Sequence, residues 1–391
     1  MNNPRAFATL AVHAGESPCP ATGALDTPIY QSSTFVAADS DEMSAVYGEE
    51  KFGYMYTRYG NPTIRALEQK LAALEGSEAA LAFASGMAAI SSAIMGYVKT
   101  GDHVVAPRML YGAAYNFLNK KLPRMGAEVT FVPSNRIEDL ERAIRPNTRL
   151  IYFETPSNPT LEIIDIAALA RMAKSRGIPT LIDNTFASPA LQQPLALGVT
   201  ASVHSATKYL CGHGDAMGGI VAGPKDYISA LVHEVIRDYG GVISPFNAWL
   251  ILRGIRTLHL RMPAHCANAQ RIAEFLAAHP QVERVNYPGL PAHPGHEVAR
   301  RQMRAFGAVI SFEVNGGYES GKKVIDRVQL FARAASLGDT RSLIVHSAST
   351  SHRAVPPSER QAMGITDGLV RLSVGVEAAE DLVQDLDQAL G

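Results

Sequence analysis

Short apolar runs alternate with amphipathic segments through the middle of the chain. The apolar runs predict strands at Ala79–Phe83, His103–Ala106, Glu128–Val132, Arg149–Glu154, Pro179–Asp183, Ala201–His204 and Gly219–Ala222. The amphipathic segments predict helices at Thr63–Leu74, Met87–Val98, Ala113–Leu122, Ile137–Ile144 and Ile166–Ser175. Strands that alternate with helices indicate βαβ units. The expected fold class is therefore α/β, with a mostly parallel sheet covered by helices on both faces.

The pattern changes on both sides of this region. Residues 1–55 contain few periodic segments and are expected to form an N-terminal arm. Residues 56–245 form the expected α/β domain. Residues 246–391 begin with a long helical stretch, Phe246–Ala278, which we expect to be interrupted near Met262-Pro263. Strands predicted at Ala308–Val314 and Leu369–Val374 then indicate a smaller C-terminal α+β domain.

Composition narrows the class of protein. The 391 residues carry a formal net charge of −1 with interspersed charges, which argues against nucleic-acid and membrane-surface binding. No apolar run is long enough to span a bilayer, and the first residues lack a signal-peptide pattern. Three cysteines without a CxxC pair fit a reducing, cytoplasmic location. The twelve histidines form no metal-ligand motif, so we expect no metal.

The segment SVHSATKYLCGHGD, residues 202–215, places Lys208 after a predicted buried strand. Burial lowers the pKa of a lysine, which makes its free amine available for Schiff-base chemistry. Ser205 and Thr207 are two residues apart, so in an extended segment their hydroxyls point the same way and could hold a phosphate. The pattern favours pyridoxal 5′-phosphate (PLP) bound through Lys208. The alternative is an exposed lysine near a loop.

A carboxylate in the preceding strand supports this interpretation. Asp183 ends the apolar run in IPTLIDNTF, 25 positions before Lys208. A PLP site needs a carboxylate that keeps the pyridinium nitrogen protonated. An aspartate at a strand end can also be a helix cap or a turn residue. Asp183 and Lys208 together indicate a PLP site more specifically than either residue does alone.

A second anion site is predicted at FASGMAAISSAI, residues 83–94. Here a strand ends, Ser85-Gly86-Met87 turns, and a helix begins. Free N–H groups at the start of a helix bind anions. A Ser-Gly turn can also be a simple helix cap. The interpretation as an anion site is supported by the phosphate that Ser205 and Thr207 already imply.

The motifs SVHSATKYLCGHGD, DNTF, ETPSNP, FASGM and YTRYGNPT resemble those of the Cys/Met-metabolism family of PLP enzymes, fold type I. The resemblance runs from AVHAGE to GLVRLSVGVE, nearly the whole chain, and it makes residues 56–245 the PLP-binding domain. It implies a cofactor-binding set of Tyr56, Arg58, Gly86, Met87, Tyr111, Asn158, Asp183, Ser205, Thr207 and Lys208.

The resemblance also implies roles for individual residues. Lys208 would carry the cofactor and move protons, and Tyr111 would stack on the pyridine ring and act as an acid on the γ leaving group. An aromatic residue at position 111 could equally be core packing. Ser336 and Arg371 would hold the carboxylate of a small amino-acid substrate. An arginine within an apolar strand is costly without an anionic partner, which independently supports that role.

Assembly follows from the same resemblance. Tyr56 and Arg58 would reach the phosphate site of a neighbouring subunit, and the expected assembly is a homotetramer, a dimer of dimers with shared active sites. Without the resemblance, Arg58 is only a surface arginine.

The specific reaction depends on finer features. GHGD, SLGD and RDYGGVISP are similar to the γ-lyases, but Ala113 stands where methionine γ-lyases usually have cysteine, and Ala335 where cystathionine γ-lyases have glutamate. We expect α,γ-elimination of γ-substituted, sulfur-containing amino acids such as methionine, giving 2-oxobutyrate, ammonia and a thiol. The alternatives are γ-replacement by an O-acylhomoserine sulfhydrylase or cystathionine γ-synthase, a cystathionine lyase, and a non-catalytic binding protein with a degenerate fold.

Overall fold

A seven-stranded sheet forms the centre of the larger part of the molecule in the computed structural model, which describes residues 5–133, 135–350, 353, 357–362 and 364–391. The strand order is β1-β7-β6-β5-β4-β2-β3. The strands are β1 (Ala79–Phe83), β2 (His103–Pro107), β3 (Glu128–Val132), β4 (Thr148–Glu154), β5 (Thr180–Asp183), β6 (Ala201–His204) and β7 (Gly219–Gly223). β2 to β6 run parallel, and β7 is antiparallel to both of its neighbours. The mostly parallel sheet predicted from the sequence is confirmed.

Helices cover both faces of this sheet. The helices of this region are α3 (Pro62–Glu75), α4 (Gly86–Met95), α5 (Gly112–Asn116), α6 (Ile137–Arg142), α7 (Ile166–Ser175), α8 (Ser188–Leu191), α9 (Lys225–Leu231) and α10 (Arg237–Tyr239), with short π and 3₁₀ turns at Phe117–Lys121, Leu122–Met125, Pro194–Leu197 and Val232–Ile236. On one face, α4, α5 and α9 pack on Leu81, Leu181 and Val203. On the other face, α3 packs on Ala80 and Ala222. On the same face, α6 and α7 pack on Val105, Ile151 and Ile182. Strands buried on both sides explain the continuous apolar runs.

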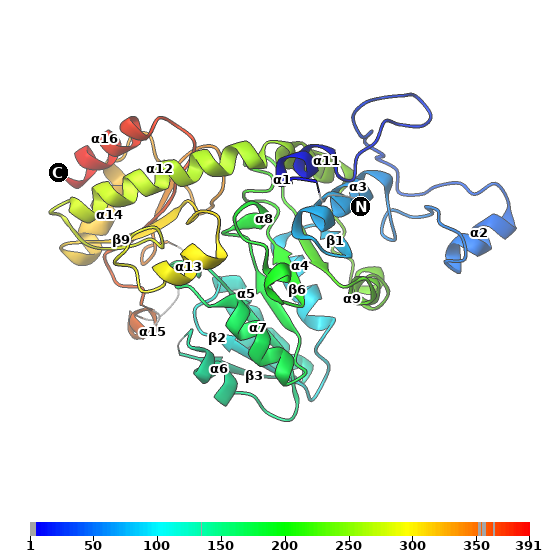
Figure 1. Ribbon diagram of the computed structural model, residues 1–391, viewed down its shortest axis with the longest axis horizontal. Coiled ribbons are helices and arrows are strands. Elements are labelled where there is room, and N and C mark those ends of the chain that lie inside the picture. Colours follow the sequence, from blue (N-terminus) through cyan, green and yellow to red (C-terminus); the bar gives the residue numbers. More distant parts are fainter. Residues whose placement is uncertain (1–4, 134, 351–352, 354–356, 363) are drawn as a thin grey trace.

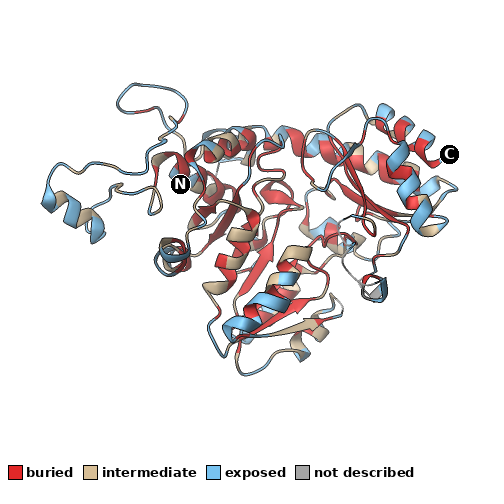
Figure 2. Cartoon of the chain, turned by 180° about the vertical axis from the view of Figure 1, so that it is seen from behind, coloured by how far each residue is buried: buried red, intermediate tan, exposed pale blue. Residues whose placement is uncertain are grey.

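A second, five-stranded sheet follows in the C-terminal part. Its order is β10-β11-β12-β9-β8, formed by β8 (Val282–Asn286), β9 (Val309–Val314), β10 (Ala332–Arg333), β11 (Leu343–His346) and β12 (Leu369–Ser373). The helices here are α11 (Pro245–Arg256), α12 (Leu258–Ala278), α13 (His296–Gln302), α14 (Gly317–Arg327), α15 (Pro357–Ala362) and α16 (Ala379–Leu390). Figure 2 shows that the buried residues concentrate on the strands and on the inner sides of these helices.

The interruption in the long helical stretch lies at Thr257, so the prediction of a break near Met262-Pro263 is wrong. Pro263 lies inside α12, which continues past it to Ala278. Thr257 separates α11 from α12 with φ −102° and ψ 3°. Its hydroxyl donates to the carbonyl of Gly254 and accepts from Arg261 Nε, which fixes the corner between the helices.

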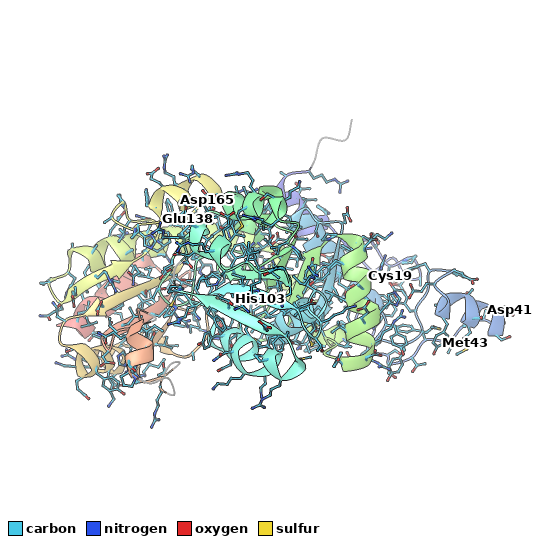
Figure 3. All side chains as sticks on the ribbon, turned by 90° about the horizontal axis from the view of Figure 1, so that it is seen from below. Cys19, Asp41, Met43, His103, Glu138 and Asp165 are labelled. Carbon is cyan, nitrogen blue, oxygen red and sulfur yellow. The ribbon has the colours of Figure 1, made fainter. Side chains whose placement is uncertain are left out.

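The first 55 residues contain two helices that the sequence pattern did not predict. α1 (Phe7–His13) is tied to the body because the fully buried Lys70 ammonium bonds to Glu16 at 2.7 Å and to the carbonyls of Ala11 and Val12. α2 (Ser40–Tyr47) lies far out on a projecting segment (Figure 1). Figure 3 shows the same projection, with Asp41 and Met43 near its tip.

The projecting segment, which consists of α2 and the residues on either side of it, exposes large apolar side chains. Val36 is 99% exposed and Phe52 is 67% exposed. Apolar groups that are this exposed on an extended segment are typical of an interaction surface. Within the described residues, no helix is long and apolar enough to cross a membrane.

Candidate active site

Lys208 lies in the turn that follows β6. Its ammonium donates to the hydroxyl of Ser336 at 2.8 Å. Ser336 belongs to the segment before β11, so this bond joins the two sheets at one point. Burial, together with the nearby charge of Arg371, lowers the pKa of Lys208 to about 8. An appreciable share of the amine is therefore uncharged near neutral pH and can act as a nucleophile.

Asp183 ends β5, the strand next to β6, and pairs in register with Val203. Its carboxylate is 7% exposed and accepts the backbone N–H of Thr185 at 2.9 Å. Burial raises the pKa of Asp183, while the Thr185 bonds and the charge of His204 act in the opposite direction. Asp183 and Lys208 thus follow neighbouring parallel strands at the same edge of the sheet, where α/β sheets bind their ligands.

Gly86 brings Ser205 to the start of α4. Ser85 caps this helix by accepting the N–H of Ala88 at 3.1 Å, and Gly86 and Met87 are its first two residues. A Cβ at Gly86 would lie 2.8 Å from the Cβ of Ser205, too close for any other residue type. The first-turn N–H groups and the Ser205 hydroxyl therefore lie around one small space, which suits a phosphate.

The prediction that Ser205 and Thr207 lie in an extended segment is wrong. The two residues are in a turn and not in an extended strand, because Lys208 N–H bonds back to the Ser205 carbonyl at 3.1 Å. The Thr207 hydroxyl donates to the carbonyl of Gly218 at 3.2 Å and accepts the N–H of Gly218 at 3.1 Å. The alternation of a strand therefore does not orient these hydroxyls.

Arg371 lies on β12 in the second sheet and is 8% exposed. One terminal nitrogen donates to Asn158 Oδ1 at 2.9 Å, and the other donates to the carbonyl of Ser336 at 3.0 Å. Its Nε has no hydrogen-bond partner among the described residues. A buried guanidinium that bonds only to neutral groups is suited to receive an anion.

Tyr111 immediately precedes α5, and 45% of its surface is exposed. Its hydroxyl lies within electrostatic reach of Arg371, and its backbone N–H bonds to the carboxylate of Glu154. An exposed aromatic side chain beside the other candidates is inconsistent with the core-packing alternative.

Tyr56 and Arg58 are positioned differently. Both lie just beyond the N-terminal arm of residues 1–55, and Tyr56 is 40% exposed. Arg58 donates to the carbonyl of Arg237, and its guanidinium lies over the Tyr59 ring. The contacts that the structure gives for these two residues stay with the arm and the α10 segment, so within one chain they are not gathered with Lys208.

The residues around Lys208 fit PLP. The amine that would hold it, a buried carboxylate for the ring nitrogen, and a cradle that a Cβ at Gly86 would fill lie together at one sheet edge. The unpaired Nε of Arg371 adds a site for an anionic group. In the described residues, no group of three or more His, Cys, Asp or Glu is arranged to hold a metal ion.

Two further residues belong to the same region and were not singled out from the sequence. Thr185 joins Asp183 to Ser205, because its N–H bonds to the carboxylate while its hydroxyl accepts the Ser205 N–H at 2.8 Å. Glu154 ends β4 and accepts the N–H of Asn158 at 3.4 Å. Both residues lie in motifs already noted, DNTF and ETPSNP, whose polar residues after apolar runs were the available signal.

Comparison with known proteins identifies the family. The pattern of the Cys/Met metabolism PLP-dependent enzymes matches residues 8–391. An L-methionine gamma-lyase from Porphyromonas gingivalis is 50% identical over 98% of this chain and 96% of its own length. An O-succinylhomoserine sulfhydrylase from Pseudomonas aeruginosa is 44% identical over 98% and 95%. The crystal structure of cystathionine gamma-lyase from Lactobacillus plantarum complexed with L-serine superposes with a TM-score of 0.92 at 40% identity, covering 98% of both chains.

Proposed function

Because the chain belongs to the Cys/Met-metabolism family of PLP-dependent enzymes, we propose that it catalyses the α,γ-elimination of methionine and similar γ-substituted amino acids. The reaction consumes water and gives 2-oxobutyrate, ammonia and a thiol. The observation that carries the proposal is the Lys208 amine, 2.8 Å from Ser336 and close to the buried guanidinium of Arg371. A proton-transfer group and a carboxylate site thus lie together.

Several residues at this sheet edge would hold PLP. Lys208 would bind it covalently, Asp183 would pair with its ring nitrogen, Asn158 would approach its phenolic oxygen, and Tyr111 would stack on its ring. Its phosphate would be bound by Gly86, Met87, Ser205 and Thr207, and by Tyr56 and Arg58 of a neighbouring subunit. When bound, PLP supplies an electron sink that stabilises negative charge on the substrate carbons.

Arg371 and Ser336 orient the substrate by its carboxylate. The planar guanidinium of Arg371 suits a bidentate carboxylate. The carboxylate oxygens would replace Asn158 Oδ1 and the Ser336 carbonyl as its hydrogen-bond acceptors. Holding the carboxylate there directs the Cα hydrogen toward Lys208. The uncharged amine would remove the proton from Cα and pass it on to the cofactor. Uncharged again, it could then accept a proton from Cβ.

Tyr111 delivers a proton to the departing γ sulfur. Its exposed side chain is accessible to a substrate, and its closeness to the Arg371 charge supports a position above the bound carboxylate. General-acid help at the leaving group is worth about 10²–10⁴-fold in rate. Loss of the Tyr111 hydroxyl should therefore lower kcat much more than it raises KM.

The side-chain pocket favours neutral substituents. Ala335 stands beside Ser336 and offers no charge to a distal ammonium, and Ala113 leaves space near Tyr111. A methyl thioether needs neither a charge nor a hydrogen bond. The proposal therefore ranks methionine above cystathionine, whose distal end carries both an ammonium and a carboxylate.

γ-Replacement is the second candidate, supported by the 44% identity to the O-succinylhomoserine sulfhydrylase. The two reactions share their first proton transfers and differ in whether a thiol adds before release. The test incubates methionine, cystathionine, homocysteine and O-acylhomoserines with and without sulfide, and measures 2-oxobutyrate and thioether or thiol products. Methionine with no thiol added should give the highest kcat/KM. Product formed only from an O-acylhomoserine with sulfide would establish replacement instead.

A further inference from the structure

Two carboxyl groups lie side by side on one buried face of the central sheet. β4 and β5 are parallel neighbours in which Glu154 pairs in register with Asp183, and Tyr152 pairs with Leu181. In-register neighbours point to the same face, and alternate residues along a strand do so too. Tyr152, Glu154 and Asp183 therefore share one face, with exposures of 0%, 6% and 7%. Three acidic groups are thus buried together.

Few groups are present to compensate these charges. Among the described residues, the loops contribute only the backbone N–H groups of Asn158 and Tyr111 as hydrogen-bond donors to Glu154. Asp183 receives the Thr185 bonds from its own loop and the electrostatic influence of His204 from β6. In the described part of the chain, the hydrogen bonds and ion pairs of Glu154 include no lysine or arginine, and the Tyr152 hydroxyl has no partner.

Two neighbouring carboxyl groups cannot both be ionised in such a place, because like charges in a desolvated site repel strongly. Burial, followed by the Asp183 charge, raises the pKa of Glu154 well above its usual value. The pKa of Asp183 is also raised by burial, but Thr185 and His204 favour its ionised form. The charge therefore belongs on Asp183, and the proton on Glu154.

We propose that Glu154 is a positioning residue that remains a neutral carboxylic acid beside Asp183, so that Asp183 is the single carboxylate facing the pyridinium nitrogen. The inference rests on the PLP site of the proposed function. Glu154 also holds the backbone of Asn158 and Tyr111, the two residues assigned to the edge and face of the ring. One neutral group thereby fixes two cofactor contacts without competing for the ring nitrogen.

Infrared spectroscopy of the holoenzyme tests the protonation state directly. The wild-type minus Glu154→Gln difference spectrum at pH 7 should contain the C=O band of a carboxylic acid. The loss of an ionised carboxylate band instead would overturn the proposal. Glu42→Gln provides the control, since Glu42 also accepts a backbone N–H, from Ala38 at 2.6 Å, but the Lys51 ammonium lowers its pKa, so its difference spectrum should contain only the band of an ionised carboxylate.

PLP affinity gives the second measurement. Glu154→Gln keeps a neutral group with an acceptor oxygen, so its Kd for PLP should stay within about threefold of wild type. Glu154→Ala removes the acceptor of the Asn158 and Tyr111 backbone N–H groups and should weaken PLP about tenfold, because an unsatisfied polar group costs about 1–3 kcal/mol. If Glu154→Gln weakens PLP as much as Asp183→Asn does, Glu154 acts as a charge and the proposal fails.

A third measurement covers the case in which Glu154→Gln does not fold. Glu68 and Glu162 are the other glutamates with raised pKa values in the described chain. Glutamate labelled with ¹³C at its carboxyl group is incorporated into a Glu68→Gln/Glu162→Gln protein, which is titrated. A labelled acid band that persists above pH 7 supports the proposal, and its loss by about pH 5 overturns it. None of these readouts uses turnover, so a failure to eliminate methionine would contradict only the proposed function.

Discussion

Lys208 combines a buried position with a neutral hydrogen-bond partner. Its ammonium bonds to the Ser336 hydroxyl and is not paired with a carboxylate, so nothing offsets the desolvation that lowers its pKa to about 8. Only the uncharged amine attacks an aldehyde. The protonation of this one group should therefore control how the enzyme without cofactor takes up PLP.

The uptake rate should follow the fraction of uncharged amine. Because deprotonation occurs at pH about 8, the rate constant for PLP capture should rise nearly tenfold per pH unit below pH 8 and level off above it. Stopped-flow absorbance measures this rate, and borohydride reduction followed by peptide mapping should place PLP on Lys208. A rate that keeps rising toward pH 10.5, the usual lysine value, would show that the amine is not desolvated.

Ala335 should determine discrimination against cystathionine. An introduced carboxylate would attract the distal ammonium with about 1–3 kcal/mol if partly desolvated. Ala335→Glu should thus raise kcat/KM for cystathionine relative to methionine roughly tenfold or more. Both substrates are measured on both proteins, with Ala335→Gln as the neutral control. An unchanged ratio, or a wild type that already prefers cystathionine, would refute this account of the pocket.

At the scale of elements, the contact between the β6 turn and α4 determines the phosphate cradle. Gly86→Ala would push its Cβ against Ser205, and overpacking costs about 1–3 kcal/mol. PLP affinity should fall about tenfold. Gly112→Ala is the matched control, because Gly112 also begins a helix but has no atom within 4 Å of an added Cβ. Equal losses in both variants would mean that the cradle is not at Gly86.

The sequence predicted the elements that depend on local pattern. β1, β3 and β6 have the predicted bounds because short apolar runs end at turn residues. The helix break was misplaced because Pro263 is the visible helix breaker, while the corner at Thr257 is made by a hydroxyl and a backbone angle that the pattern does not reveal. Strands β8, β10 and β11 were missed. β8 is half-exposed, so its apolar alternation is weak.

The site residues that the sequence predicted are likewise those that depend on local pattern. Lys208 and Asp183 were predicted because each follows an apolar run and the parallel topology brings such ends together. Glu154 follows a run of the same kind, but its importance comes from its register with Asp183, which only the assembled sheet fixes. The bonds of Arg371 to Asn158 and Ser336 likewise join residues that are far apart in sequence.

At the scale of the whole molecule, the projecting arm is the part that we propose contacts a second copy of the chain. It extends from the body in Figure 1 and carries exposed apolar side chains, with Tyr56 and Arg58 just beyond it. A second copy would cover this surface and receive Arg58 at its phosphate site, in an isologous dimer or a dimer of dimers.

Subunit mixing tests this arrangement. Arg58→Ala and Lys208→Ala proteins should each have low activity, because each lacks one part of every site. Mixed in equal amounts, half of the dimers are hybrids with one complete site, so activity should recover to about a quarter of wild type. Sedimentation checks the assembly. A fully active monomer, or no recovery in demonstrated hybrids, would exclude shared sites.

The most direct test of the central claim is the product balance from methionine alone. The purified enzyme with PLP, given L-methionine and no added thiol, should release 2-oxobutyrate, ammonia and methanethiol in equal amounts. Lys208→Ala of the same fold should release none, because it lacks the group that moves the Cα and Cβ protons. Release by Lys208→Ala at the wild-type rate, or no 2-oxobutyrate from the wild type, would contradict the account.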